Sequence, residues 1–578
     1  MYEKVVEIND SFSAKMFEHQ SQDNKSKYYG GIIDPIMGVA RPSHGNTPRV
    51  IAAWVASIVN PDSNYFHNKE LVKRLSGATD YMLNNQHSDG TISLGATNYH
   101  SPPDTGFVVV GLSQVYQVLN MHEWEQLKDI RENIRLFLKR SIPALLTGGG
   151  HTPNHRWVIT AALSFLYRIF SNEELLIRAE QWLAEGLDYT ADGEWTERSN
   201  GIYNAVSNLM LYHAARNLER PELLEPIRKN LDLMQYLVHP SGEVVTDYSG
   251  RQDFGTTANL SNYYLIYRLM AHCDKNRTFA YMADLALEKL VEPSSVDNNA
   301  MIGHLLFPLI REETIERKKI PNEYVKIINE THPRDTYLQK LENTQSHMNI
   351  LHSSPHLAFG SPIVRYKKEN TSATIMTNTP SILSLRHGSV RLLGTKITTA
   401  FSPGVVDFDE FKEIQGGYRL KKILEKGYHG PVPSEYLSQL EKVEENITPW
   451  YLLPHHHRPI THLQKHLLTV DIFPGERSWD IHLTSDKHEE IFTQVTFIFG
   501  KEGQFSGEHL KAGSNPDQFF LTRGTFKYSA GNDSITISNG AYEHWIEVLN
   551  KDHHSPDCKH VSVNLMTPID TTFKLTLN

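Results

Sequence analysis

The sequence has few cysteines and no long apolar run. Its 578 residues include only two cysteines, Cys273 and Cys558, which excludes a disulfide framework and a thiolate metal site. No segment reaches the roughly 18 consecutive apolar residues that a transmembrane helix needs. The N-terminus, MYEKVVEINDSFSAKMFEHQ, lacks an apolar stretch after a basic start. We therefore expect no signal peptide, no membrane partner and a cytoplasmic location.

Positive charge is also scarce. The chain has 57 Lys and Arg against 67 Asp and Glu, a net charge of −10, so nucleic acid is not an expected partner. An anionic substrate would need a local positive pocket. The length predicts two or three domains, and the composition is that of a folded protein; neither indicates an oligomeric state.

The first half of the sequence is helical in pattern. From about Thr47 to Ile310, apolar residues recur at three-and-four spacing, and segments such as TPRVIAAWVASIV are apolar nearly all round. Such segments are typical of inner helices in a layered α-fold. Loops rich in glycine and polar residues precede the apolar helices about every fifty residues, the spacing of a helix-pair array. We expect these loops to lie at one end and to form one functional face.

The second half alternates apolar and polar residues in short segments, such as FTQVTFIFG and HVSVNLMTP, separated by turn residues. This pattern predicts an antiparallel β-sandwich. The charged stretch between the halves predicts a linker. The expected domains are therefore residues 1–311, a linker at 312–354, and residues 355–578.

Two loops carry candidate site residues at helix entrances. In GGGHTPNHRW, Asn154 either caps the helix beside a surface His155 or takes part in a site that the glycines open to a ligand. In DGEWTERSNGIYNAV, Tyr203 is either a packing aromatic or a proton-transfer phenol. A nearby arginine such as Arg198 would lower the pKa of that phenol and favour it as a base.

These two segments resemble the heparinase II/III-type polysaccharide lyases. The family has an (α/α) toroid followed by an antiparallel β-sandwich, so the resemblance implies that residues 1–311 form an incomplete toroid carrying the catalytic site. It also implies β-elimination on a glycan that contains uronic acid. Asn154 would bind the uronate carboxylate, with His155 or Arg156 assisting, and Tyr203 would act as acid and base.

The resemblance also implies a catalytic histidine in the β half, for which His387 is the nearest match. His100, His151 or His304 are alternatives. The predicted catalytic residues are Asn154, His155, Tyr203 and His100. The predicted substrate-binding residues are His151, Arg156, Trp195, Arg198, Asn204, Tyr248, Arg251 and His387.

No metal or other cofactor is needed for this chemistry. A structural zinc in the β half is an open alternative, because His462 and His466 share one face of a strand near Asp471. Two other functions also stay open. A glycoside hydrolase would use paired carboxylates among Asp104, Glu197 and Asp253, and a non-catalytic glycan-binding protein would use the same loops as a cleft.

Overall fold

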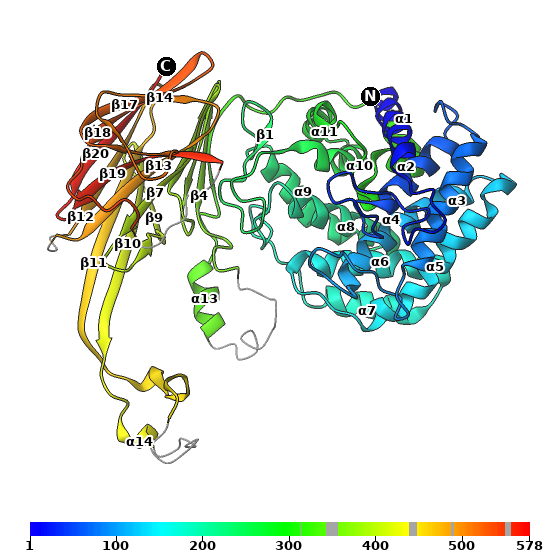
Figure 1. Ribbon diagram of the computed structural model, residues 1–578, viewed down its shortest axis with the longest axis horizontal. Helices are drawn as coiled ribbons and strands as arrows, with labels where there is room; N and C mark the ends of the chain where they lie inside the picture. The colour runs from blue at the N-terminus through cyan, green and yellow to red at the C-terminus, as the bar shows by residue number, and fades with distance from the viewer. Residues whose placement is uncertain (312–313, 343–355, 438–447, 487–489, 550–556) are drawn as a thin grey trace. The chain divides into compact units, whose positions relative to one another are not determined.

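The computed structural model describes residues 1–311, 314–342, 356–437, 448–486, 490–549 and 557–578 (Figure 1). These residues form two compact units. One comprises Met1–Asn322 and Ile328–Gly360, and the other Glu323–Ile327 and Ser361–Asn578. The predicted linker, 312–354, therefore contributes to both units, and its described part includes the strand β3 (Glu323–Ile328) and the helix α13 (Arg334–Glu342).

The first unit is a two-layered ring of helices. They are α1 (Tyr2–His19), α2 (Thr47–Val59), α3 (Lys69–Asn84), α4 (Pro102–Asn120), α5 (Lys128–Thr147), α6 (Pro153–Phe170), α7 (Glu173–Leu183), α8 (Tyr203–Asn217), α9 (Leu224–Met234), α10 (Tyr264–Asp274), α11 (Arg277–Lys289) and α12 (Ala300–Leu306). Helices α2, α4, α6, α8, α10 and α12 each contact the next, and α12 contacts α2, which closes the inner ring. Helices α3, α5, α7, α9 and α11 each pack on the inner helix before them.

Side-chain polarity separates the two layers. In α2 every residue except Arg49 is buried, whereas α3 buries one face, including Leu71 and Leu75, and exposes the other. The predicted (α/α) toroid is thus present, and it is incomplete in that α12 spans only 7 residues. Although the inner helices are strongly apolar, none of the helices in the described ranges combines the length and hydropathy of a membrane span.

The second unit is a sandwich of two sheets. One sheet has the strand order β14-β17-β18-β20-β12-β11-β10-β9 and the other β15-β16-β19-β13-β7-β6-β5-β4-β3, with β8 beside β7. The strands are β4 (Ile363–Lys368), β5 (Thr371–Met376), β6 (Leu383–His387), β7 (Val390–Thr399), β8 (Gly404–Val405), β9 (Glu410–Ile414), β10 (Gly417–His429), β11 (Ile460–Phe473), β12 (Ser478–Ser485), β13 (Phe492–Gly500), β14 (Gln504–Ser506), β15 (Leu510–Ala512), β16 (Gln518–Leu521), β17 (Gly524–Ala530), β18 (Asp533–Gly540), β19 (Cys558–Met566) and β20 (Asp570–Leu577). The short helix α14 (Ser434–Leu437) lies between β10 and β11 in the sequence.

Alternation along the strands builds the core of the sandwich. In β12, for example, Trp479, Ile481 and Leu483 are buried and the residues between them are not. From β4 to β20, neighbouring strands are antiparallel except β16 and β19, which are parallel. The predicted antiparallel sandwich is confirmed apart from this pair.

Phe497→Ala should destabilise the sandwich by about 3–5 kcal/mol, because a fully buried ring leaves a cavity. Phe497 lies in β13 with its ring 5.6 Å from that of Phe573. Tyr428→Ala is the control, since Tyr428 is 66% exposed. Denaturant unfolding of both variants measures the difference. Equal stabilities would contradict this account of the core.

Candidate active site

A cavity of about 690 Å³ lies within the toroid, where the inner helices begin. Its wall includes Asp104 in the first turn of α4, His155 in the first turn of α6 and Tyr203 at the start of α8. Residues of the loops at 94–98, 151–152 and 251–252 complete it. The predicted gathering of the polar loops at one end of the toroid is confirmed. Helix N-termini carry partial positive charge, so their convergence favours an anionic ligand.

Tyr203 and Arg251 form the centre of this wall. The Arg251 guanidinium lies over the Tyr203 ring, 4.2 Å from its centroid, and Gln252 Nε2 donates a hydrogen bond to the phenol oxygen. Burial raises the pKa of Tyr203, while Arg251 and Gln252 oppose that rise. Two expectations are therefore corrected. The cation beside the phenol is Arg251 rather than Arg198, and the pKa of the phenol is raised rather than lowered, so it rests protonated.

Asn154 lies behind the wall and is 1% exposed. Its Nδ2 donates to both carboxylate oxygens of Glu197, at 3.0 and 2.9 Å, and to Thr152 Oγ1. Its Oδ1 is buried without a hydrogen-bond partner among the described residues. Thr152, not Asn154, is the N-cap residue of α6. The alternative in which Asn154 caps its helix is therefore wrong.

Glu197 is the residue that joins Asn154 to Arg251. Arg251 forms an ion pair with the carboxylate that Asn154 also contacts, and Glu197 is 3% exposed. Burial raises the pKa of Glu197 to about 7, although Arg251 and Asn154 both lower it. Glu197 thus holds two of the predicted site residues in place. The sequence offers Glu197 as one of the paired carboxylates of a hydrolase.

The predicted histidines fall in different places. His151 and His155 line the cavity, and burial lowers the pKa of His155 to about 4, so its ring is neutral. His100 is exposed, pairs with Asp89 at 2.8 Å and is not part of the cavity wall. His304 is buried on α12, bonded to the Tyr264 hydroxyl. His387 lies at the end of β6 in the second unit, bonded to Thr371 Oγ1.

Five predicted substrate contacts support packing instead. Arg156 pairs with Glu185 and Asp188, Trp195 Nε1 donates to Asn208, and Asn204 Nδ2 donates to Asn200. The polar groups of these residues bind other residues of the protein, and none of the three lines the cavity. The Arg198 guanidinium lies over the buried Tyr248 ring, 4.8 Å from its centroid. Four of the five are buried in the loop cluster, whereas Arg156 is partly exposed beside Glu185 and Asp188. None of the five lines the space between the helices.

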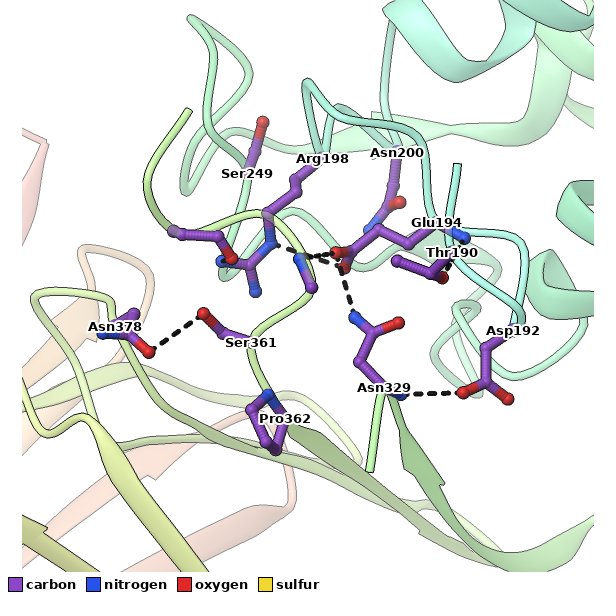
Figure 2. Close-up of polar contacts among 12 residues, drawn as sticks. Thr190, Asp192, Glu194, Arg198, Asn200, Ser249, Asn329, Ser361, Pro362 and Asn378 are labelled. Carbon is purple, nitrogen blue, oxygen red and sulfur yellow. Dashed lines mark hydrogen bonds and ion pairs between the residues drawn. The ribbon is translucent and has the colours of Figure 1, made fainter. Parts of the chain in front are cut away.

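Arg198 also belongs to a buried polar cluster around Glu194 (Figure 2). Glu194 pairs with Arg198 at 3.3 Å and accepts hydrogen bonds from Asn329 Nδ2 and the Gly360 amide, both at 3.0 Å. Arg198 donates to the Ala358 carbonyl at 2.7 Å. This cluster fixes the returning segment of the first unit beside the loop that ends at Tyr203.

Two glycines of the first loop, Gly148 and Gly150, are explained by packing as well. A Cβ on Gly148 would collide with the Ala144 carbonyl and Pro102, and one on Gly150 would lie 2.6 Å from the Cβ of His155. The expected role of these glycines, to admit a ligand, is therefore replaced by close packing of the loop on α4 and α6.

Sequence reasoning missed other residues of the wall, chiefly His44, Gln252 and Asp297. His44 stands in RPSHGNTP, a loop of the same glycine and polar composition before the apolar α2, so the loop pattern was available there. Asp104, one of the candidate hydrolase carboxylates, lies in the first turn of α4. Ser101 is the cap, and its hydroxyl and Asn98 Nδ2 both donate to Asp104.

The suggested zinc ligands of the β half do not converge. His466 bonds Asp486, and Asp471 is held by Arg419 through two hydrogen bonds of 2.6 Å. Across the described ranges, no group of three or more His, Cys, Asp or Glu side chains has an arrangement that could hold a metal ion.

Comparison with known proteins finds similar folds among solved structures. No family model matches the sequence, and no curated protein does. Among solved structures, a mutant of the heparan sulfate lyase HepC from Pedobacter heparinus matches with a TM-score of 0.50 and 10% identity, over 99% of this chain and 83% of that chain. A Paenibacillus xanthan lyase matches with a TM-score of 0.52 and 10% identity, over 99% of this chain and 56% of that one.

The chain has the fold of these polysaccharide lyases. Identity this low establishes the fold alone, and it confirms the predicted fold class and the resemblance at that level. In this lyase fold, the cavity at the inner-helix N-termini is the candidate active site.

Glu197→Gln should change stability in a pH-dependent way. Because the folded-state pKa of about 7 exceeds the ordinary 4.5, the protonated carboxyl stabilises the wild type below about pH 4.5, and that stability is lost as the pH rises through about 7. Glutamine does not titrate. The free energy of unfolding of the variant, relative to wild type, should therefore rise by up to roughly 3 kcal/mol between about pH 5 and pH 8.

Thermal unfolding over this pH range measures the effect. Glu225→Gln is the control, because Glu225 is 53% exposed on α9 and its replacement should change stability little at any of these pH values. If the free energies of unfolding of Glu197→Gln and wild type differ by the same amount at every pH, the pKa of Glu197 is not raised in the folded protein.

Proposed function

We propose that this protein cleaves a glycan containing uronic acid by β-elimination. The observation that carries the proposal is the pairing of a protonated phenol and a guanidinium, Tyr203 and Arg251, on the wall of a toroid cavity. The fold shared with the heparan sulfate lyase and the xanthan lyase supports the same class of reaction.

The uronate carboxylate needs a positive partner in this reaction, because charge grows on it as the neighbouring proton leaves. Arg251 supplies a cation on the cavity wall, and the N-termini of α4, α6 and α8 add to its potential. The Asn154 amide lies behind the cavity wall, where its Nδ2 donates a hydrogen bond to Glu197. We assign Arg251 the contact with the carboxylate, and Asn154 supports it indirectly through Glu197, which both residues contact.

Elimination also needs an acid and a base. A base removes the proton α to the carboxylate, the electron pair forms the new carbon–carbon double bond, and the bond from the β carbon to the glycosidic oxygen breaks. Tyr203 donates its phenol proton to that leaving oxygen, a role that suits a phenol with a raised pKa. A histidine of the cavity wall takes the first proton.

The test is a screen of the purified protein against glycosaminoglycan, alginate, pectic and glucuronan-type substrates. A lyase product contains a double bond conjugated to the carboxylate, so ultraviolet absorbance rises as bonds are cut. New reducing ends without that rise would identify a hydrolase, for which Asp104 and Asp297 are the carboxylates on the wall. Binding without bond cleavage would identify a glycan-binding protein.

Tyr203→Phe should lower kcat for elimination by roughly 100-fold or more while KM changes little, because the ring remains and only the proton donor is lost. Tyr212→Phe, on the same helix and absent from the cavity wall, is the matched control. Steady-state kinetics by ultraviolet absorbance compare the two. A Tyr203→Phe variant with wild-type kcat would exclude the phenol as the acid.

Arg251→Lys should raise KM and lower kcat/KM by roughly 10-fold or more, since lysine keeps the charge but loses the planar guanidinium that stacks on Tyr203 and contacts Glu197. Arg228→Lys, which alters a pair with Asp274 on the outer layer, serves for comparison. If Arg251→Lys and Arg228→Lys have the same kinetics, Arg251 does not bind the carboxylate.

A further inference from the structure

We propose that His44, assisted by the nearby buried carboxylate of Asp297, is the general base that removes the proton α to the uronate carboxylate. The inference rests on the proposed lyase function and assigns one of its chemical roles. Both residues line the cavity that contains Tyr203 and Arg251. They belong to segments far apart in the sequence, the loop before α2 and the 3-10 turn at Val296–Asn298.

The His44 ring is held in a defined position. It stacks on Phe107 of α4, with ring centroids 4.8 Å apart and an angle of 28° between the planes. The Val296 amide donates to the His44 carbonyl at 3.1 Å, which ties its loop to the turn that carries Asp297. His44 Nδ1 is buried and has no hydrogen-bond partner among the described residues.

Asp297 is the nearby carboxylate. It is 3% exposed, and its Oδ1 is buried without a hydrogen-bond partner within the described ranges. Gln114 Nε2 donates to its backbone carbonyl at 3.1 Å, and Gly111 allows Val296 to approach α4 closely, so the turn is firmly seated. Burial raises the pKa of Asp297, and the neighbouring His44 is the largest influence that lowers it.

The two orphaned atoms complement each other chemically. A buried carboxylate near an imidazole stabilises the imidazolium that forms when the ring accepts a proton. In the elimination step, His44 gains the proton from the substrate, and the electron pair of the broken C–H bond becomes the new double bond. Asp297 does not contact the reacting atoms in this scheme. It is a positioning residue.

His155 is another histidine of the wall that could take this role. Its pKa of about 4 makes it a weak base at neutral pH. The nearest carboxylate, Asp104, already accepts hydrogen bonds from Ser101 and Asn98. Other ionisable groups on the same wall are Arg251 and His151, which add positive rather than negative charge. Asp297 is therefore the carboxylate best able to compensate a protonated histidine.

The experiment compares His44→Asn, Asp297→Asn and the control His19→Asn, at the end of α1, on the glycan that the screen identifies. His44→Asn should lower kcat by roughly 100-fold or more with KM within a few-fold, and added imidazole should restore part of the rate. Asp297→Asn should lower kcat less and shift the acidic limb of the pH–kcat profile. His19→Asn should behave as wild type.

The outcomes separate this inference from the function on which it rests. If the wild-type protein never produces the conjugated double bond, both the lyase function and the assignment of His44 as its base are wrong. An active wild type together with a His44→Asn variant that retains most of its kcat overturns only the assignment of the base. Circular dichroism and substrate binding by each variant establish that it is folded. A folded His44→Asn variant that binds substrate, has lost turnover and is not rescued by imidazole also counts against His44 as the base.

Discussion

The buried carboxylate of Glu197 holds together the loops from which the site is made. It accepts the amide of Asn154, 43 residues earlier in the chain, and pairs with Arg251, 54 residues later. Arg251 in turn covers the ring of Tyr203. Without this carboxylate, a guanidinium and an amide would be left uncompensated in a largely buried environment. The cavity chemistry therefore depends on one residue that does not itself line the cavity.

Other buried carboxylates repeat this principle around the ring. Asp253 accepts from Ser199, Ser249 and the Gly201 amide, which fixes the start of α8. Glu194 anchors residues 329 and 360, and Asp297 faces the cavity from its turn. The apolar inner helices form the core of the toroid. The buried carboxylates fix the positions of the polar loops that precede these helices. Rigid loops on a packed scaffold are what an active site of this kind requires.

Local pattern predicted much of the fold. Three-and-four spacing identified α2, α6 and the other inner helices, and alternation identified strands such as β13. The segment at 312–354 did not behave as a simple linker, because β3 lies within it and joins a sheet edge. Its six residues, EYVKII, are too short a run to distinguish a strand from a charged linker without the neighbouring strand β4.

Within the site, the sequence alone determined which loops matter and brought Tyr203, Arg251, His151 and His155 to notice, because glycine and polar residues before apolar helices are a local signal. Only the tertiary structure decided which side chains face the cavity. Arg156, Trp195 and Arg198 carry the same chemistry in the same loops, yet they turn into the packing. Closure of the inner ring sets these directions and brings His44 near Asp297, and neither follows from the order of residues along the chain.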